Sequence, residues 1–204
     1  MFVRTVYATG DPTKIDAALR ALNTVGRDLL VERPGYRGAS VFVDRELGKL
    51  LSASWWSSAA ERHNSDEVMS VRRAGLLGPF AGTVTVDNYD VAAFHAFQHP
   101  RAGGGLRITR LEFDPADANL LADVFRASVL PRLETLRGIA GASLFVDPER
   151  GRAMSCFVFV DRESLAASRA GLAVVRHEGV AKAHATVTGL EEFEVVYADV
   201  HAAD

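Results

Sequence analysis

Apolar and polar positions along the first half of the chain follow two different periods. Residues 2–9, 38–44, 50–56 and 83–97 alternate or run continuously apolar, which predicts four strands. Between the first two, apolar residues recur three and four apart, which predicts a long amphipathic helix after Asp11-Pro12. Its expected buried stripe is Ile15, Ala18, Leu19, Leu22, Val25, Leu29 and Leu30. A capping-box sequence from Ser58 to Glu61 predicts a second helix, so the element order is β-α-β-β-α-β.

The same pattern recurs 103 positions later without a gap. The stretch from Gly38 to Gly48, GASVFVDRELG, returns as GASLFVDPERG from Gly141 to Gly151. Such a period predicts two copies of one structural unit. We therefore expect a first domain over residues 1–97, a linker over 98–105 and a second domain over 106–204. In the second copy, Pro131 is expected to kink the long helix.

The order β-α-β-β-α-β is that of the ferredoxin-like unit, an antiparallel sheet with both helices on one face. The strands here are apolar on both faces, as in Val41-Phe42-Val43 and Trp55-Trp56, so the second sheet face also needs a cover. The fold class predicted is α+β, with two tandem ferredoxin-like domains pairing sheet to sheet as an internal pseudo-dimeric α/β barrel. The matched Arg4 and Arg107 suggest a structural role at the interface of the two domains.

The composition argues against nucleic-acid and membrane partners. The 204 residues carry a formal net charge of -3 and no basic run, so we expect no nucleic-acid partner. No apolar run approaches the roughly 18 residues that span a bilayer, and no signal peptide is expected, so no membrane partner is expected. The single cysteine, Cys156, lies in an apolar strand pattern, which favours a buried thiol and a cytoplasmic location.

Three segments resemble the dimeric α/β-barrel superfamily, and within it the antibiotic-biosynthesis-monooxygenase-like (ABM) domains. They are Pro34-Gly35-Tyr36-Arg37-Gly38 before the second strand, the acidic turn from Asp44 to Gly48, and the run from Phe159 to Ala167. The resemblance covers both copies. It implies that the barrel formed elsewhere by two chains is formed here by one, with further homodimerisation open.

The resemblance also implies a function: cofactor-independent oxidation or binding of a small hydrophobic or aromatic molecule. In such oxygenases the substrate's own anion reacts with O₂, and the protein supplies an apolar pocket between sheet and helices with a few hydrogen-bond donors. One alternative is a non-catalytic ligand-binding or stress-associated protein whose pockets are filled by side chains.

A further alternative is a heme-binding protein, although we expect neither a cofactor nor a metal. The heme-degrading branch uses an asparagine on the first strand and a tryptophan and histidine on the second helix. The first strands here, residues 2–9 and 105–113, contain no asparagine, and both tryptophans lie on the third strand. His63 beside Asn64 on the second helix keeps heme ligation as a hypothesis.

The first copy is the better candidate for a pocket because it holds both tryptophans and most of the tyrosines. Adjacent strand residues point to opposite faces, so one tryptophan should meet the helices and the other the second sheet. Core packing and strand-edge hydrogen bonding are the competing structural interpretations of these residues. The catalytic candidates are Tyr7, His63 and His95, and the substrate-binding candidates are Trp55, Trp56 and Asn64.

Overall fold

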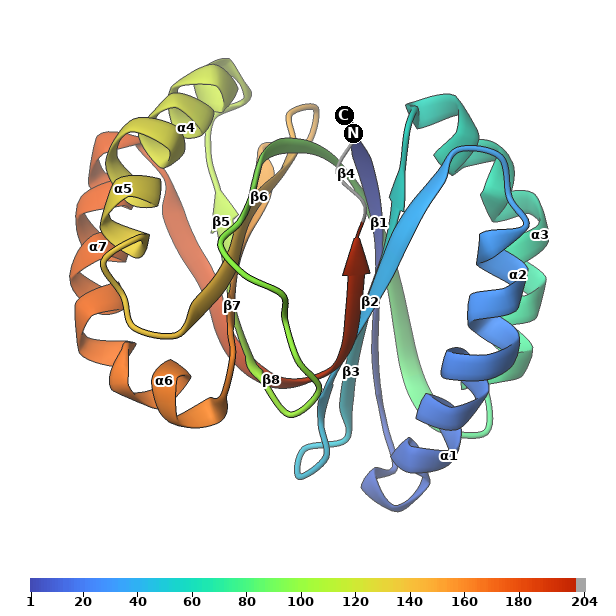
Figure 1. Ribbon diagram of the computed structural model, residues 1–204. Coiled ribbons are helices and arrows are strands. Elements are labelled where there is room, and N and C mark those ends of the chain that lie inside the picture. The colour runs from blue at the N-terminus through green and yellow to red at the C-terminus, as the bar shows by residue number, and fades with distance from the viewer. Residues whose placement is uncertain (201–204) are drawn as a thin grey trace. The chain divides into compact units, whose positions relative to one another are not determined.

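The computed structural model describes residues 1–200 and has the expected α+β composition. The chain divides into two compact units (Figure 1). Unit 1 comprises Met1–Asn88 together with the segment from Val196 on, and unit 2 comprises Tyr89–Val195. In each unit, helices cover one face of an antiparallel sheet.

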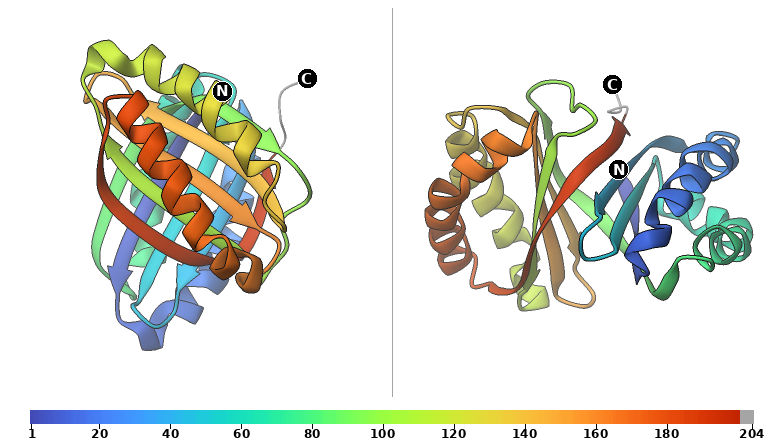
Figure 2. Two further views of the ribbon diagram at one scale, coloured as in Figure 1. Left: turned by 90° about the vertical axis from the view of Figure 1, so that its left-hand side faces the viewer. Right: turned by 90° about the horizontal axis from the view of Figure 1, so that it is seen from below.

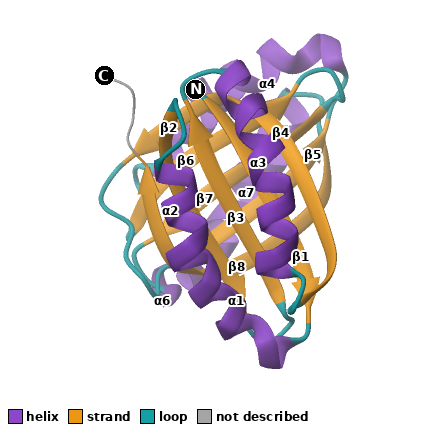
Figure 3. Ribbon diagram, turned by 90° about the vertical axis from the view of Figure 1, so that its right-hand side faces the viewer, coloured by secondary structure: helices purple, strands orange, loops and turns teal. Residues whose placement is uncertain are grey.

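Unit 1 follows the predicted order of elements. Its strands are β1 (Phe2–Gly10), β2 (Tyr36–Asp44), β3 (Lys49–Trp56) and the first part of β4 (Ala81–Ala96). The first helical segment consists of a 3-10 turn (Pro12–Lys14), α1 (Ile15–Ala21), a π-helical turn (Leu22–Gly26) and α2 (Arg27–Val31), and the second helix is α3 (Ala59–Leu77). Figure 3 shows α1, α2 and α3 lying across the strands of this unit.

Unit 2 repeats this order. Its strands are β5 (Gly105–Glu112), β6 (Ile139–Asp147), β7 (Arg152–Phe159) and the first part of β8 (Thr186–Val200). Its helices are a 3-10 turn (Pro115–Asp117), α4 (Ala118–Val124), a π-helical turn (Phe125–Val129), α5 (Leu130–Leu133), α6 (Arg162–Ala167) and α7 (Arg169–Lys182). Figure 2 shows α4, α5 and α7 lying across the sheet.

Strand registers agree between positions 103 apart. Val3 pairs with Trp55 in β1 and β3, and Leu106 pairs with Val158 in β5 and β7. Both hairpins also carry an irregularity at matched places, after Tyr36 in β2 and after Ile139 in β6. The hydrogen-bonded strand order β1-β3-β2-β8-β5-β7-β6-β4 closes into a barrel, as the predicted fold class requires.

The helix starts follow the predicted capping chemistry. Asp11 and Asp114 each accept a hydrogen bond from a backbone N–H two residues on, and a proline occupies the next position in both. Ser58 accepts from the N–H of Glu61, and its hydroxyl donates to the Glu61 carboxylate at 2.9 Å. The serine half of the capping box is therefore confirmed, whereas the glutamate accepts from the serine hydroxyl and not from the serine backbone N–H as predicted.

The π-helical turns correct one part of the predicted stripe. A π turn holds one extra residue, so it shifts which residues face the sheet beyond it. Val25 was expected to be buried but is 52% exposed, and Gly26 is buried in its place. The turns at Leu22–Gly26 and Phe125–Val129 are also 103 positions apart. In the second copy this turn directly precedes Pro131, where a kink was expected.

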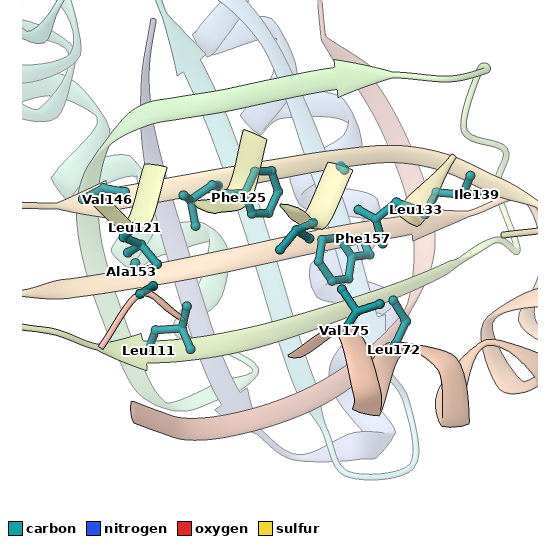
Figure 4. Packing of buried hydrophobic residues seen from close by; sticks show 14 of the residues in the cluster. Leu111, Leu121, Phe125, Leu133, Ile139, Val146, Ala153, Phe157, Leu172 and Val175 are labelled. Carbon is teal, nitrogen blue, oxygen red and sulfur yellow. The ribbon is translucent and has the colours of Figure 1, made fainter. Parts of the chain in front are cut away.

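Each unit has its own core between sheet and helices. In unit 1, Ile15, Ala18 and Leu19 pack on Val41 and Leu50. In unit 2 the core is larger and includes the stacked rings of Phe125 and Phe157, whose centroids are 6.2 Å apart (Figure 4). These cores place helix residues and strand residues of one unit against each other.

Glycines at matched positions end the two hairpin turns. Replacing them tests whether the two turns are structurally equivalent. Gly48 has φ +61° and Gly151 φ +60°, and a Cβ at either position would lie 2.3 Å from a backbone oxygen, that of Gly10 or of Phe113. We expect Gly48→Ala and Gly151→Ala to lower the free energy of unfolding by similar amounts, about 1–3 kcal/mol each. Urea unfolding of both variants measures this.

The matched control is Gly75→Ala. Gly75 lies in α3 with no atom within 4 Å of an added Cβ, so alanine should stabilise the helix by roughly 0.5–1 kcal/mol. A large loss at one hairpin glycine and none at the other would contradict the structural equivalence of the two turns.

Candidate functional site

Unit 1 contains a cavity of about 60 Å³ between its sheet and its helices. The helix side is formed by the π-helical turn, through Leu22 and Gly26, and by Met69 and Arg73 of α3. The strand side is formed by residues of β1, β2, β3 and β8, namely Arg4, Val6, Ala39, Ser40, Val41, Ser52, Ala53, Ser54 and Tyr197. π-helical turns occur frequently at functional sites, so this position under the turn marks the cavity as a candidate site.

Arg4 is the central charged group of the cavity lining. Its side chain is 3% exposed, and its guanidinium donates to the Ser65 hydroxyl at 2.8 Å and to the backbone oxygen of Arg62. Its Nε–H has no hydrogen-bond partner within the part of the chain that the structure describes. A buried donor without a partner is costly, so it is a ready hydrogen-bond donor for a ligand atom.

A carboxylate partly balances this charge. Asp66 lies 3.6 Å from Arg4 and 3.1 Å from Arg73, so two arginines share one carboxylate. Burial lowers the pKa of Arg4 to about 10; Asp66 opposes the shift, and Arg73 and Arg62 add to it. Arg4 therefore remains charged at neutral pH, and the group of Arg4, Arg73 and Asp66 carries a formal charge of +1.

The rest of the lining offers hydroxyls beside apolar surface. Ser52 and Ser54 lie on the helix-facing side of β3, and Tyr197 of β8 has its pKa raised by burial. A positive charge, hydroxyl donors and apolar walls are together suited to hold an apolar molecule that carries one negative charge.

The size of this cavity limits what enters it without movement. At about 60 Å³ it has room for a few water molecules, whereas an apolar cavity that binds benzene has about 150 Å³. An aromatic ring therefore requires side chains to move. Leu22 and Leu76 are partly buried, line the cavity and are the nearest side chains to Gly26. We therefore expect these two side chains to move when a ring enters.

The corresponding cavity of unit 2 is more apolar. It measures about 50 Å³ and is lined by Thr109, Ser155, Arg176, Gly179 and nine apolar side chains, among them Phe125, Phe157 and Val129. These last three residues stand at the positions of Leu22, Ser54 and Gly26 in unit 1. Arg107, the counterpart of Arg4, pairs with Glu192 and does not line this cavity.

The catalytic candidates lie away from the unit 1 cavity. Tyr7 is partly buried on β1, and strand alternation places it on the face opposite to Arg4 and Val6. His63 is exposed on α3, and His95 is exposed on the part of β4 that belongs to unit 2, with its ring 4.5 Å from that of Phe97. None of the three lines the cavity, and their catalytic role stays a prediction.

The substrate-binding candidates are divided between core and surface. Trp56 is fully buried; its indole N–H donates to Ser54 at 3.1 Å and its ring meets the edge of Tyr36 at 5.9 Å. Trp55 is 4% exposed on the opposite strand face. Asn64 is exposed and lines a separate surface hollow of about 160 Å³ with Arg33 and Glu61. Only Trp56, through Ser54, adjoins the cavity lining.

The two cavities under the π-helical turns do not fit heme. A space of 50–60 Å³ between helices and sheet is too small for a porphyrin, and exposed His63 lines neither cavity. Residues 1–200 contain no cluster of three or more histidine, cysteine, aspartate or glutamate side chains placed to hold a metal ion. Cys156 is buried as expected, and burial raises the pKa of its thiol to about 12, which makes it a poor ligand or nucleophile.

Arg4, Asp66 and Arg73 emerge as site residues from the structure. For Arg4 the signal in the sequence is a charged residue at a strand position where neighbours are apolar, and it recurs at Arg107. That repeat was attributed to the interface of the two domains, but the hydrogen-bond partners of Arg4 lie on α3 of its own unit.

None of the helices in residues 1–200 is long and apolar enough to cross a membrane.

Comparisons with known proteins give relatives in sequence and in structure. No protein-family profile matches the chain. The uncharacterized protein Rv2558 of Mycobacterium tuberculosis is 32% identical over 201 residues, which cover 97% of this chain and 84% of the relative. An anthrone oxidase-like protein aligns with a TM-score of 0.72 at 14% identity, over 100% of this chain and 96% of that one.

A second solved structure is LmHde, a heme-degrading enzyme from Listeria monocytogenes. It aligns with a TM-score of 0.55 at 8% identity, over 95% of this chain and 99% of that one. At such identities the two structures establish the fold. Both alignments extend over nearly the whole chain, so they concern both units.

Proposed function

Because this chain belongs to the family of the Mycobacterium tuberculosis protein Rv2558 and has the dimeric α/β-barrel fold of monooxygenase-like proteins, we propose that unit 1 binds a small aromatic molecule as its anion. The activity proposed is oxidation of that molecule by O₂ without a cofactor. The observation that carries the proposal is Arg4, a buried charged arginine with an unpartnered Nε–H at a cavity that is otherwise lined by Arg73, hydroxyl groups and apolar side chains.

The proposed oxidation requires the protein mainly to stabilise the substrate anion. In a molecule such as anthrone, the ring CH₂ group opposite the carbonyl, and conjugated with it through the flanking aromatic rings, is deprotonated to an enolate, whose electrons reduce O₂. One oxygen atom becomes the new C=O group, and the other leaves as water with the two hydrogens of the CH₂ group. Arg4 and Arg73 hold the enolate oxygen, because preorganised donors in a desolvated site stabilise developing negative charge.

Two variants of unit 1 test this site, with anthrone as the substrate probe. Arg4→Met removes the charge, and we expect it to lower the rate of O₂ consumption about a hundredfold, the usual cost of losing an oxyanion donor. Gly26→Val copies Val129 of unit 2 and keeps every charge while it narrows the cavity. It should weaken anthrone binding about tenfold, as expected when an apolar ligand loses its space. An oxygen electrode and the absorbance of the quinone product measure both.

The exposed Arg45, which pairs with Asp16 near the surface, supplies the matched control. Arg45→Met removes the same charge as Arg4→Met and should leave the rate unchanged. Equal rates for Arg4→Met and the parent would exclude the proposed role of Arg4. Circular dichroism of each variant separates loss of activity from loss of folding.

Binding without oxidation is the second candidate function. The small volume of the unit 1 cavity favours it, because a site that must open for a ligand leaves little room for O₂ beside it. Saturable anthrone binding that Arg4→Met weakens, with no O₂ uptake, would support this function over the oxidase. Absence of anthrone binding in the parent protein would argue against both.

A further inference from the structure

A second hollow lies in unit 2 and has a different composition. This cleft has a volume of about 350 Å³ and is lined by Arg107 of β5, Arg169 and Arg176 of α7, and Leu190 and Glu192 of β8. It is several times larger than the cavity under either π-helical turn. Three of its five lining residues are arginines.

The positive charge of this cleft exceeds its negative charge. Arg107 is 3% exposed and donates from its Nε to Glu192 at 3.0 Å. Arg169 donates to both carboxylate oxygens of the same Glu192, at 3.1 Å and 2.6 Å. Burial raises the pKa of Glu192, but the hydrogen bonds from Arg169 and Arg107 outweigh it and lower the pKa below its usual range. One ionised carboxylate is thus shared by two guanidinium groups.

Arg176 adds a third guanidinium with no such partner. It is partly buried on α7, and no carboxylate among residues 1–200 forms an ion pair with it. The cleft therefore carries a formal charge of +2. A partly buried arginine gives up hydration, so it favours a site where an anion replaces the lost water.

The first copy of the repeat differs from the second at two of the charged positions that line this cleft. Position 169 of unit 2 corresponds to Asp66, and position 192 corresponds to Tyr89. In unit 1 the carboxylate that pairs with arginine is Asp66 of helix α3, and in unit 2 it is Glu192 of strand β8. At the helix position of Asp66, unit 2 has Arg169. The lining of the unit 2 cleft, at +2, therefore carries one more net positive charge than the group of Arg4, Arg73 and Asp66 in unit 1.

We propose that this cleft is a binding site for a small organic oxyanion, a phosphate or carboxylate group attached to an apolar body. Guanidinium groups bind both oxyanions through paired N–H donors. The apolar body is inferred from Arg176, which lines the cleft and also the apolar cavity beside Phe125, Phe157 and Val180. A ligand held by Arg176 therefore has carbon-rich surface next to it.

Titration calorimetry of the full chain tests the site with three probes: inorganic phosphate, phenyl phosphate and hexanoate. We expect phenyl phosphate to bind more tightly than inorganic phosphate, because only the former has an apolar group. Hexanoate binding as tightly as phenyl phosphate would assign the site to carboxylates, and weaker hexanoate binding would assign it to phosphates. Each affinity should fall as salt concentration rises.

The decisive variant is Arg176→Met, because Arg176 gives up no ion pair when it is replaced. It should weaken phenyl phosphate binding about tenfold or more, the usual cost of a charge-assisted hydrogen bond, while the unfolding midpoint stays close to that of the parent. Arg150→Met, at an exposed hairpin turn, removes the same charge and should leave the affinity unchanged.

Equal affinities of Arg176→Met and Arg150→Met would overturn the proposal, as would absence of binding of all three probes at millimolar concentration. Equal affinities for inorganic and phenyl phosphate would overturn the apolar part of the inference. The result is independent of unit 1, because none of these variants alters Arg4 or its cavity.

Discussion

Replacing Trp56 by alanine is expected to lower the free energy of unfolding by about 3–5 kcal/mol, the usual cost of deleting a buried aromatic side chain. Trp56 is fully buried, packs edge-on against Tyr36 and donates its indole N–H to Ser54. The deletion leaves a large void and an unpaired Ser54 hydroxyl. For a chain of this length the thermal unfolding midpoint should fall by roughly 6–20 °C, at about 2–4 °C for each kcal/mol.

Thermal unfolding followed by circular dichroism measures this effect. Trp56→Phe keeps most of the buried volume and should lose less than half as much stability. Val71→Ala, at a side chain that is 75% exposed on α3, should change stability by no more than about 0.5 kcal/mol. A small effect of Trp56→Ala would mean that the ring is not part of the core, and would favour its predicted role as a substrate contact.

Glu192→Ala is expected to have the second-largest effect, a loss of about 2–3 kcal/mol at neutral pH. Removing one partner of a buried ion pair costs about 3–5 kcal/mol, and solvent around Glu192, which is 29% exposed, reduces that figure. The variant leaves Arg107 buried without its carboxylate. Urea unfolding at neutral pH measures the loss.

The same pair predicts a pH dependence. The pKa of Glu192 is lower in the folded protein than its ordinary value of 4.5, because hydrogen bonds from Arg169 and Arg107 outweigh the effect of burial. Its contribution to stability is therefore complete above about pH 4.5 and is lost as the pH falls through the folded pKa. The difference between parent and Glu192→Ala should shrink on acidification.

Glu178 provides the comparison, because it pairs with Arg132 where both side chains are more than 40% exposed. Glu178→Ala should cost less than about 1 kcal/mol. A Glu192→Ala loss that stays constant down to pH 3 would contradict the assigned ionisation of Glu192.

The hydrophobic pattern was sufficient to predict the fold. Strand periods, the two Asp-Pro helix starts and the Ser58 N-cap all depend on local chemistry, and the structure has each of them. The hydrophobic pattern and the capping residues did not predict the π-helical turns. No residue type demands a π turn, so a 3.6-residue period carried across Leu22–Gly26 placed Val25 on the wrong face.

The candidate site was harder to predict because it depends on which side chains meet across elements. Histidine, tyrosine and tryptophan attracted attention as residue types, whereas the cavity charge comes from Arg4 on a strand and Asp66 and Arg73 on a helix. Their proximity depends on tertiary packing. The arginines pair with Asp66 of a helix in unit 1 and with Glu192 of a strand in unit 2. This difference likewise cannot be predicted before the strands and helices are assembled.

The strands β4 and β8 have a consequence for any attempt to express one copy alone. Residues 89–96 of β4 pair with β6 in unit 2, although they belong to the first copy of the repeated sequence, and β8 likewise continues from unit 2 into unit 1. Neither copy on its own contains all the strands of its sheet. A copy expressed alone would therefore expose an unpaired strand edge, which favours association with a second copy or aggregation.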